Sequence, residues 1–331
     1  MKKTRLIFIK KLFVYIFLII LSQTAVYYAS GDNKLFYPAQ IVYSIQLLKR
    51  ANDIVYMGDS VLLCHNSKDK NKAYIPDMLR NVLKNRKITS IIGIAYQLDV
   101  YYAICRYIVS HQYPIKTIII PINLRAFSTS WAQRPEYQFV KYKAIFKYDN
   151  FLFRIFFKPL RVFRAINLTP ISQEEYLKLP VYYGNKIAGT VREYSDEKKF
   201  EAVTEENMKQ KIIFHYMFSL DKKHPQLKSM MRLAKLLKKK NMRMVFYITP
   251  VDWQTCSRYI GNDFQMRVKK NIDVISDLLY EQNLSLLDLS FGLPSEAFDW
   301  EQNVYPNEHL SERGRMYIAE KLAVQLSEHA F

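Results

Sequence analysis

Cysteine is scarce in this chain of 331 residues, which contains only Cys64, Cys105 and Cys256. An odd and sparse set does not make a disulfide framework, and no spacing of Cys and His matches a metal site. Acidic residues are also few, 30 against 49 Lys and Arg, so the formal net charge is +19. The core alone must therefore stabilise the fold, and the charge predicts an anionic partner or surface, which can be phospholipid, acidic polysaccharide or nucleic acid.

Internal repeats and low-complexity segments are absent as well. Half of the residues are hydrophobic, so a sizeable core is available and a disordered chain is excluded. Paired bases such as Lys238-Lys239-Lys240 lack the aromatic platforms and motif frames of known nucleic-acid modules. We therefore expect no nucleic-acid partner.

Charges are absent from Leu12 to Ala29, after a basic start at Met1-Lys2-Lys3-Thr4-Arg5 and Lys10-Lys11. That length predicts a membrane-spanning helix with its lysines on the cytoplasmic side. The alternative is a signal peptide cleaved after Ala29-Ser30-Gly31. We favour an uncleaved anchor, because Tyr27 and Tyr28 suit a membrane interface. Residues 1–31 are thus predicted to be an anchor or signal that contacts membrane lipid, and residues 32–331 an extracytoplasmic domain.

Short apolar runs predict the strands of a buried sheet at Ile54–Met57, Ile88–Ile92, Lys116–Pro121, Met244–Thr249 and Leu284–Leu289. Amphipathic segments predict helices at Pro76–Asn85, Leu98–His111, Gln226–Lys240, Asp263–Glu281 and Glu312–His329. Strands that alternate with helices form parallel βαβ units. The sequence therefore predicts an α/β fold with about five parallel strands.

The alternation stops from about Arg125 to Lys211, which we predict to be a large insertion. Within it, Phe139–Ile166 is dense in aromatic and basic residues, with Asp149 as its one acid. Such a segment suits the surface of an anionic membrane or a lid over a bound glycan. The alternative is that its apolar side packs on the main domain while the bases face solvent.

The first predicted strand ends in Gly58-Asp59-Ser60. Gly58 permits a sharp exit from the strand, which places Ser60 at its carboxyl end. Ligands of open α/β sheets bind at this edge, so the Ser60 hydroxyl is a candidate nucleophile. Asp and Ser are also common helix caps, and the tripeptide alone is therefore only a hint.

Acyl transfer by a serine needs a base for its proton and hydrogen-bond donors for the developing oxyanion. Gly93 follows the second predicted strand, Asn123 follows the third and His309 follows the fifth. Each can be explained singly as a turn, cap or strand terminator. Together, in order and at successive strand ends, they predict one site at one edge of the sheet.

Other polar residues also lie just past strand ends. Arg125 and Trp131 follow the third predicted strand, and Asp252 follows the fourth. These side chains are candidates for contacting a substrate or for anchoring their loops.

This ordered set resembles the SGNH, or GDSL-like, hydrolase family: Gly58-Asp59-Ser60 matches the first block, Gly93 the second, Asn123 the third, and His309 in Glu308-His309-Leu310-Ser311-Glu312-Arg313-Gly314 the last. The resemblance spans about Ile54 to Leu326. It implies a flavodoxin-like three-layer α/β/α sandwich, with Ser60 as nucleophile and His309 as general base. The oxyanion hole would use the Ser60 N–H, the Gly93 N–H and the Asn123 side chain, and neither cofactor nor metal is implied.

The chain departs from the family at one position. The family usually has Asp three residues before the histidine, where it orients the imidazole, but Pro306 stands there. Glu308 adjoins His309 and is one candidate for this acid. Asp299, Glu301 and Asp252 are others, and a backbone carbonyl completing a Ser-His dyad is a further alternative.

The expected function is ester hydrolysis or O-acyl transfer, with acetyl as the expected group, on a cell-envelope polysaccharide. A lipid ester is the alternative substrate, with Phe139–Ile166 lying on the membrane. The departure at Pro306 also leaves open a non-catalytic protein of this fold that binds polysaccharide or takes part in its assembly.

Overall fold

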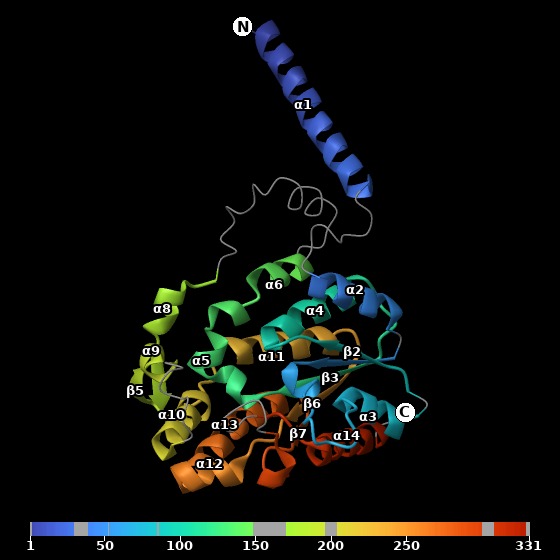
Figure 1. The fold of residues 1–331 in the computed structure, drawn as a ribbon. Coiled ribbons are helices and arrows are strands. Elements are labelled where there is room, and N and C mark those ends of the chain that lie inside the picture. The colour runs from blue at the N-terminus through green and yellow to red at the C-terminus, as the bar shows by residue number, and fades with distance from the viewer. Residues whose placement is uncertain are drawn as a thin grey trace.

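The computed structural model describes residues 2–29, 39–51, 53–84, 86–147, 170–195, 204–299 and 308–328. Five strands form one parallel sheet in the order β2-β1-β3-β6-β7 (Figure 1). Their bounds are β1 Ile54–Gly58, β2 Ile88–Ile92, β3 Thr117–Ile122, β6 Arg243–Ile248 and β7 Leu286–Asp288. This order is that of flavodoxin-like folds. The predicted α/β class and the five parallel strands are confirmed.

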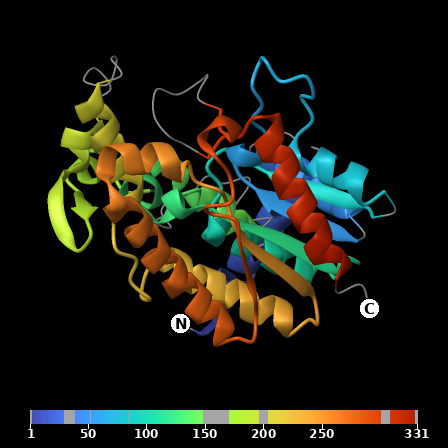
Figure 2. The same ribbon diagram turned by 90° about the horizontal axis from the view of Figure 1, so that it is seen from below.

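Helices cover both faces of this sheet (Figures 1 and 2). One face carries α4 (Leu98–Ser110), α11 (Pro225–Lys238) and α13 (Asn262–Tyr280), and α2 (Ala39–Arg50) adjoins it; the other face carries α3 (Ile75–Val82) and α14 (Glu312–Ser327). Successive side chains of a strand point to opposite faces. In β1, Val55 and Met57 are therefore buried in the first core and Ile54 and Tyr56 in the second. The three-layer arrangement follows from this alternation.

The chain between β3 and α11 leaves the βα pattern. It forms η2 (Leu124–Phe127), α5 (Thr129–Ala132), η3 (Pro135–Tyr137), α6 (Val140–Lys147), α8 (Gln173–Leu177), β4 (Pro180–Tyr183), β5 (Lys186–Thr190), α9 (Val191–Ser195) and α10 (Glu205–Tyr216). The antiparallel pair β4–β5 is a second, small sheet. α10 packs against β4, α5 and α12 (Trp253–Ile260). The sequence analysis missed this sheet, because its strands are short and most of β5 is exposed.

The aromatic and basic segment predicted at Phe139–Ile166 is described only as far as Lys147. In α6, Tyr142 and Phe146 are buried in the main core, and the Phe146 ring meets the Tyr107 ring of α4 edge-on at 5.1 Å. This part of the segment follows the packing alternative. Residues 148–169 lie outside the described residues, and the membrane and lid interpretations fall on them.

The N-terminal segment forms a helix, α1 (Lys2–Ala29), which projects away from the sheet in Figure 1. Its large apolar side chains between Ile7 and Leu21 are exposed, except for that of Ile20, which is partly buried. Across the described residues, no helix combines the length and the apolar character that crossing a membrane requires. The prediction of a membrane-spanning helix is therefore not supported; bases crowd the start of α1, and Ser22-Gln23-Thr24 interrupts its apolar run.

Candidate active site

Ser60 lies two residues past Gly58, the last residue of β1, and is the first residue of a short 3₁₀ helix, η1 (Ser60–Leu62). Asp59 caps this helix, since its Oδ1 accepts a hydrogen bond of 3.0 Å from the Val61 N–H. A Cβ on Gly58 would lie 2.0 Å from Leu62 Cδ1. Gly58 therefore makes room for Leu62 to pack over the end of β1, and this packing turns the chain so that Ser60 lies at the sheet edge.

Ser60 and His309 meet as the sequence analysis expected. The distance between Ser60 Oγ and His309 Nε2 is 3.3 Å, although the two residues are 249 positions apart. Both side chains are half-buried. Burial, together with the positive charge of Arg125, lowers the pKa of His309 to about 4. The imidazole is therefore neutral near pH 7 and can accept the Ser60 proton.

Asn123 lies beside this pair and is fixed at both ends of its amide. Its Oδ1 accepts from the Arg125 N–H at 3.0 Å, and its Nδ2 donates to Asp59 Oδ2 at 3.2 Å. Burial raises the pKa of Asp59 to about 6. The hydrogen bond from Val61, the charge of Arg125 and the hydrogen bond from Asn123 each lower this pKa and offset part of the effect of burial. The Asn123 side chain therefore reaches the residue next to Ser60.

Gly93 has a different role from the one expected. Its N–H donates to the Gly58 carbonyl at 3.2 Å, as part of the contact between β1 and β2, so this donor is already used. The prediction of an oxyanion donor at Gly93 is not what the structure shows. A Cβ here would lie 2.2 Å from Tyr96 Cζ, which makes close packing of the Tyr96 ring the reason for glycine.

Glu308 is turned towards Arg125 and Tyr216. The carboxylate is fully buried, with its Oε2 3.0 Å from Arg125 Nη2 and its Oε1 accepting from the Tyr216 hydroxyl at 2.5 Å. The Arg125 guanidinium lies over the Trp131 ring, 4.1 Å from its centroid. The prediction that Glu308 orients the imidazole is therefore wrong. Arg125 and Tyr216 hold the Glu308 carboxylate, and its negative charge pairs with the Arg125 guanidinium.

Two of the three residues proposed to touch substrate, Arg125 and Asp252, are buried, whereas Trp131 is partly exposed. Arg125 is 3% exposed, and Asp252 is 2% exposed. Asp252 caps α12 by accepting from the Thr255 N–H at 3.1 Å, and it also accepts from the Ser295 hydroxyl at 2.6 Å. Both side chains therefore follow the loop-anchoring alternative.

Among the other candidates for the acid that orients His309, Asp299 belongs to the described residues and Glu301 does not. The Asp299 N–H donates to the His309 carbonyl at 2.8 Å, and the Asp299 carboxylate accepts from Asn66 Nδ2 at 2.8 Å. Asp299 thus adjoins His309 through its backbone. Glu301 and Pro306 lie outside the described residues.

These contacts connect Ser60, His309, Arg125 and Asn123, either directly or through the next residue in the chain. Ser60 contacts His309; Glu308, the neighbour of His309, pairs with Arg125; and Asn123, on the same loop as Arg125, bonds to Asp59, the neighbour of Ser60. Each candidate residue is thus held through its neighbour in the chain. Tyr216 was missed, because it comes from α10, 92 positions before Glu308, and nothing in its local sequence indicates the contact.

Within the described part of the chain, no group of three or more His, Cys, Asp or Glu side chains is arranged to hold a metal ion. The three cysteines are free, and Cys105 and Cys256 are buried.

No protein-family model and no curated protein matches the chain. It is similar to the solved structure of a lipase/acylhydrolase from Enterococcus faecalis, at 9% identity and a TM-score of 0.40, over 84% of this chain and 96% of that one. A carbohydrate acetylesterase family member from Sinorhizobium meliloti gives the same identity and TM-score over 84% and 98%. A mutant acetylxylan esterase from Geobacillus stearothermophilus gives 12% and 0.36 over 85% and 95%. At these TM-scores, function has to be inferred from the contacts of Ser60 and His309.

The Arg125–Glu308 pair should show strong coupling in unfolding experiments. Arg125→Met or Glu308→Gln alone leaves a buried group without its partner, and each should lower the free energy of unfolding by about 3–5 kcal/mol. The double variant should recover most of this loss. Urea unfolding of the full chain measures the cycle, with Arg80→Met in the exposed Arg80–Asp77 pair as a control that costs under about 1 kcal/mol. Additive single effects would contradict the coupling.

His309 should titrate far below an ordinary histidine. The imidazole Cε1–Hε1 signal, assigned with His309→Gln, should shift with a midpoint near pH 4 in NMR spectra of the full chain. In the variant Arg125→Met/Glu308→Gln the midpoint should rise, since the nearby cation is gone, and stay below 6.5 because burial remains. A midpoint at 6.5 or above in the unmodified protein would show that His309 is solvated.

Proposed function

We propose that the protein is an SGNH-type serine enzyme that hydrolyses an ester or transfers its acyl group. The observation that carries this proposal is the 3.3 Å contact between Ser60 Oγ and the neutral His309 at the carboxyl edge of the sheet. Ser60 Oγ attacks the ester carbonyl while His309 Nε2 takes its proton. The alcohol then leaves with that proton, and an acyl group remains on Ser60.

The acyl group leaves Ser60 in a second step of the same kind. Water or a sugar hydroxyl attacks the acyl carbonyl and gives its proton to His309, which returns it to Ser60 Oγ. The oxyanion in both steps needs preorganised donors. The Ser60 N–H and the Asn123 side chain supply them; Asn123 Nδ2 carries a second hydrogen besides the one that it donates to Asp59.

As substrate we propose an O-acyl group, with acetyl as the first choice, on a cell-envelope polysaccharide. The net charge of +19 supports an anionic partner of this kind. Lipid esters are the second candidate. Leu63, just past Ser60, and Ile94, just past β2, are 38% and 65% exposed at this edge, and such side chains also accept a longer acyl chain.

The nucleophile can be tested directly with the full chain. Ser60→Ala should reduce acetate release from p-nitrophenyl acetate and from acetylated xylan by at least about a thousandfold, because the attacking oxygen is gone. A fluorophosphonate probe should label Ser60, and His309→Gln should slow the labelling, since the proton acceptor is lost. Ser229→Ala on α11 is the matched control and should behave as the unmodified protein. Absence of both turnover and labelling would favour the non-catalytic polysaccharide-binding role.

We further propose that α1 associates with lipid and holds the domain on the extracytoplasmic side of a membrane. A contiguous set of exposed apolar side chains along a helix marks a surface that binds lipid or protein, and the bases near the start of α1 suit anionic headgroups. Phe13 and Phe17, for instance, are 69% and 62% exposed.

Lipid association can be measured by co-flotation of the full chain with vesicles of phosphatidylglycerol and phosphatidylcholine. Phe13→Asp/Phe17→Asp should reduce the bound fraction severalfold, because charge opposes burial in lipid. Ile187→Asp/Met266→Asp changes two exposed apolar residues of the domain and is the matched control. Equal binding by the two double variants would refute a role for α1.

A further inference from the structure

The loop Cys64–Tyr74, between Ser60 and α3, has one inward and one outward face. Its inward positions Asp69, Asn71 and Ala73 are partly buried. The outward positions are exposed and consist of Lys68, Lys70, Lys72 and Tyr74. The chain turns at Ser67-Lys68, where the Asp69 N–H donates to the Asn66 carbonyl at 3.2 Å, and beyond this turn the partly buried and exposed positions alternate. We name these four exposed residues the lysine row.

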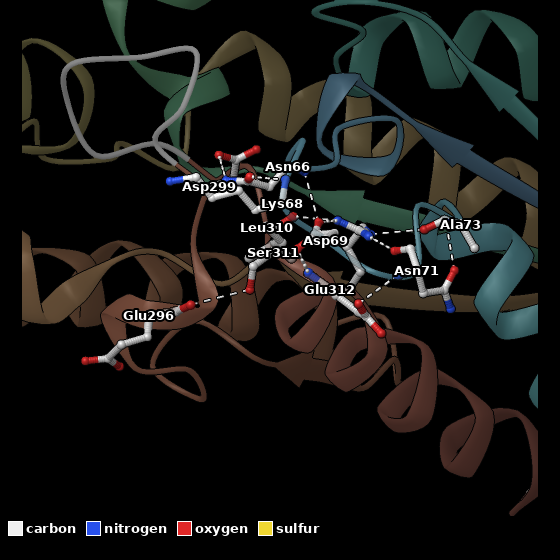
Figure 3. A network of polar contacts seen from close by, with 11 residues as sticks. Asn66, Lys68, Asp69, Asn71, Ala73, Glu296, Asp299, Leu310, Ser311 and Glu312 are labelled. Atoms are coloured by element: carbon white, nitrogen blue, oxygen red, sulfur yellow. Dashed lines mark hydrogen bonds and ion pairs between the residues drawn. The ribbon is translucent and has the colours of Figure 1, made fainter.

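Arg315 of α14 holds the inward face of this loop, of which Figure 3 shows Asp69, Asn71 and Ala73. Its fully buried guanidinium donates to Asp69 Oδ2 at 2.6 Å, to the Asn71 carbonyl at 2.6 Å and to the Ala73 carbonyl at 3.0 Å. Glu312 adds two contacts, since its carboxylate accepts from the Asn71 N–H at 2.9 Å and its N–H donates to Asp69 Oδ1 at 3.1 Å. A segment without helix or strand is thereby fixed to the main domain, and its lysines must face outwards.

The row lies next to the candidate active site. Asn66 bonds to the Asp299 carboxylate at 2.8 Å, and the Asp299 N–H bonds to the His309 carbonyl at 2.8 Å. The loop is therefore connected to Ser60 along the chain and to His309 across it.

Three charges on this row are available to a ligand. Across the described residues, Lys68, Lys70 and Lys72 form no ion pair, whereas several other exposed lysines do, such as Lys178 with Glu174. The three lysines fall within five residues of the loop, at its exposed positions, so their charges are concentrated on one short segment. The row ends in Tyr74, whose ring stacks on His65 at 5.8 Å and is 37% exposed.

We propose that the lysine row binds an anionic glycan, a polysaccharide that carries carboxylate or phosphate groups, and leads it to Ser60. Several cations on one short segment suit a polymer with repeated charges, and the Tyr74 ring offers an apolar face to a sugar. Because Arg315 and Glu312 already hold the backbone, binding costs little ordering of the loop. The inference deepens the proposed function, on which the ester part of the substrate rests, and names the charge of the polysaccharide.

Binding is tested with an ester-free ligand, so that the result does not depend on catalysis. The full chain is titrated calorimetrically with polygalacturonate, a carboxylate glycan, and with xylan, a neutral one. The unmodified protein should bind polygalacturonate more tightly at low ionic strength, and salt should weaken the binding. Lys68→Gln/Lys70→Gln/Lys72→Gln should bind it about tenfold more weakly. Tyr74→Leu should weaken it severalfold at every salt concentration, since stacking is not screened.

The matched control is Lys228→Gln/Lys235→Gln/Lys239→Gln on and beside α11, which removes the same charge from exposed lysines in the opposite layer and should bind as the unmodified protein. Equal weakening by the two triple variants would overturn the proposal in favour of net charge. Binding of phosphatidylglycerol vesicles through the lysine row without binding of polygalacturonate would overturn it in favour of lipid. Glycan binding without labelling of Ser60 would refute the proposed enzyme and leave the row intact.

Discussion

The buried ion pair between Arg125 and Glu308 is the contact on which the geometry of the site depends. It joins the loop after β3 to the segment that carries His309, at two residues with almost no solvent exposure. Desolvating both groups is costly, and the cost is offset only when the partners are well placed and further bonds are made. Tyr216 supplies one such bond and Trp131 covers the guanidinium. The pair therefore favours one arrangement of His309 over its alternatives.

Arg125 also sets the electrostatics of the site. Its charge lowers the pKa of His309 and opposes the effect of burial on Asp59. A neutral imidazole beside Ser60 is thereby favoured, while the carboxyl next to the serine stays largely ionised near pH 7. A single buried cation thus acts on both the candidate base and the capping residue of the candidate nucleophile, and Glu308 compensates that cation.

Much of the fold was predictable, because runs such as Lys116–Pro121 are too short and too apolar for anything but a buried strand. The meeting of Ser60, Asn123 and His309 was predictable too, since the carboxyl ends of parallel strands lie at one edge. The directions in which individual polar groups point could not be predicted from the sequence. Glu308 points to Tyr216 and the Gly93 N–H to Gly58, and both depend on packing between distant segments. The β4–β5 sheet was not predicted either, because its strands are short and their residues show no strong alternation of buried and exposed positions.

The contact between Ser60 and His309 has a consequence for the order of assembly. The contact joins positions 249 residues apart, and Glu308 follows all five strands of the sheet. As the chain is synthesised, β1, β3 and Arg125 are made before Glu308, so Arg125 is at first without its ion-pair partner. Contacts of such long sequence separation form late, since loop closure must be completed before they are made. An unfinished chain thus contains Ser60 without His309, and the contact between the two side chains arises only when folding is nearly complete.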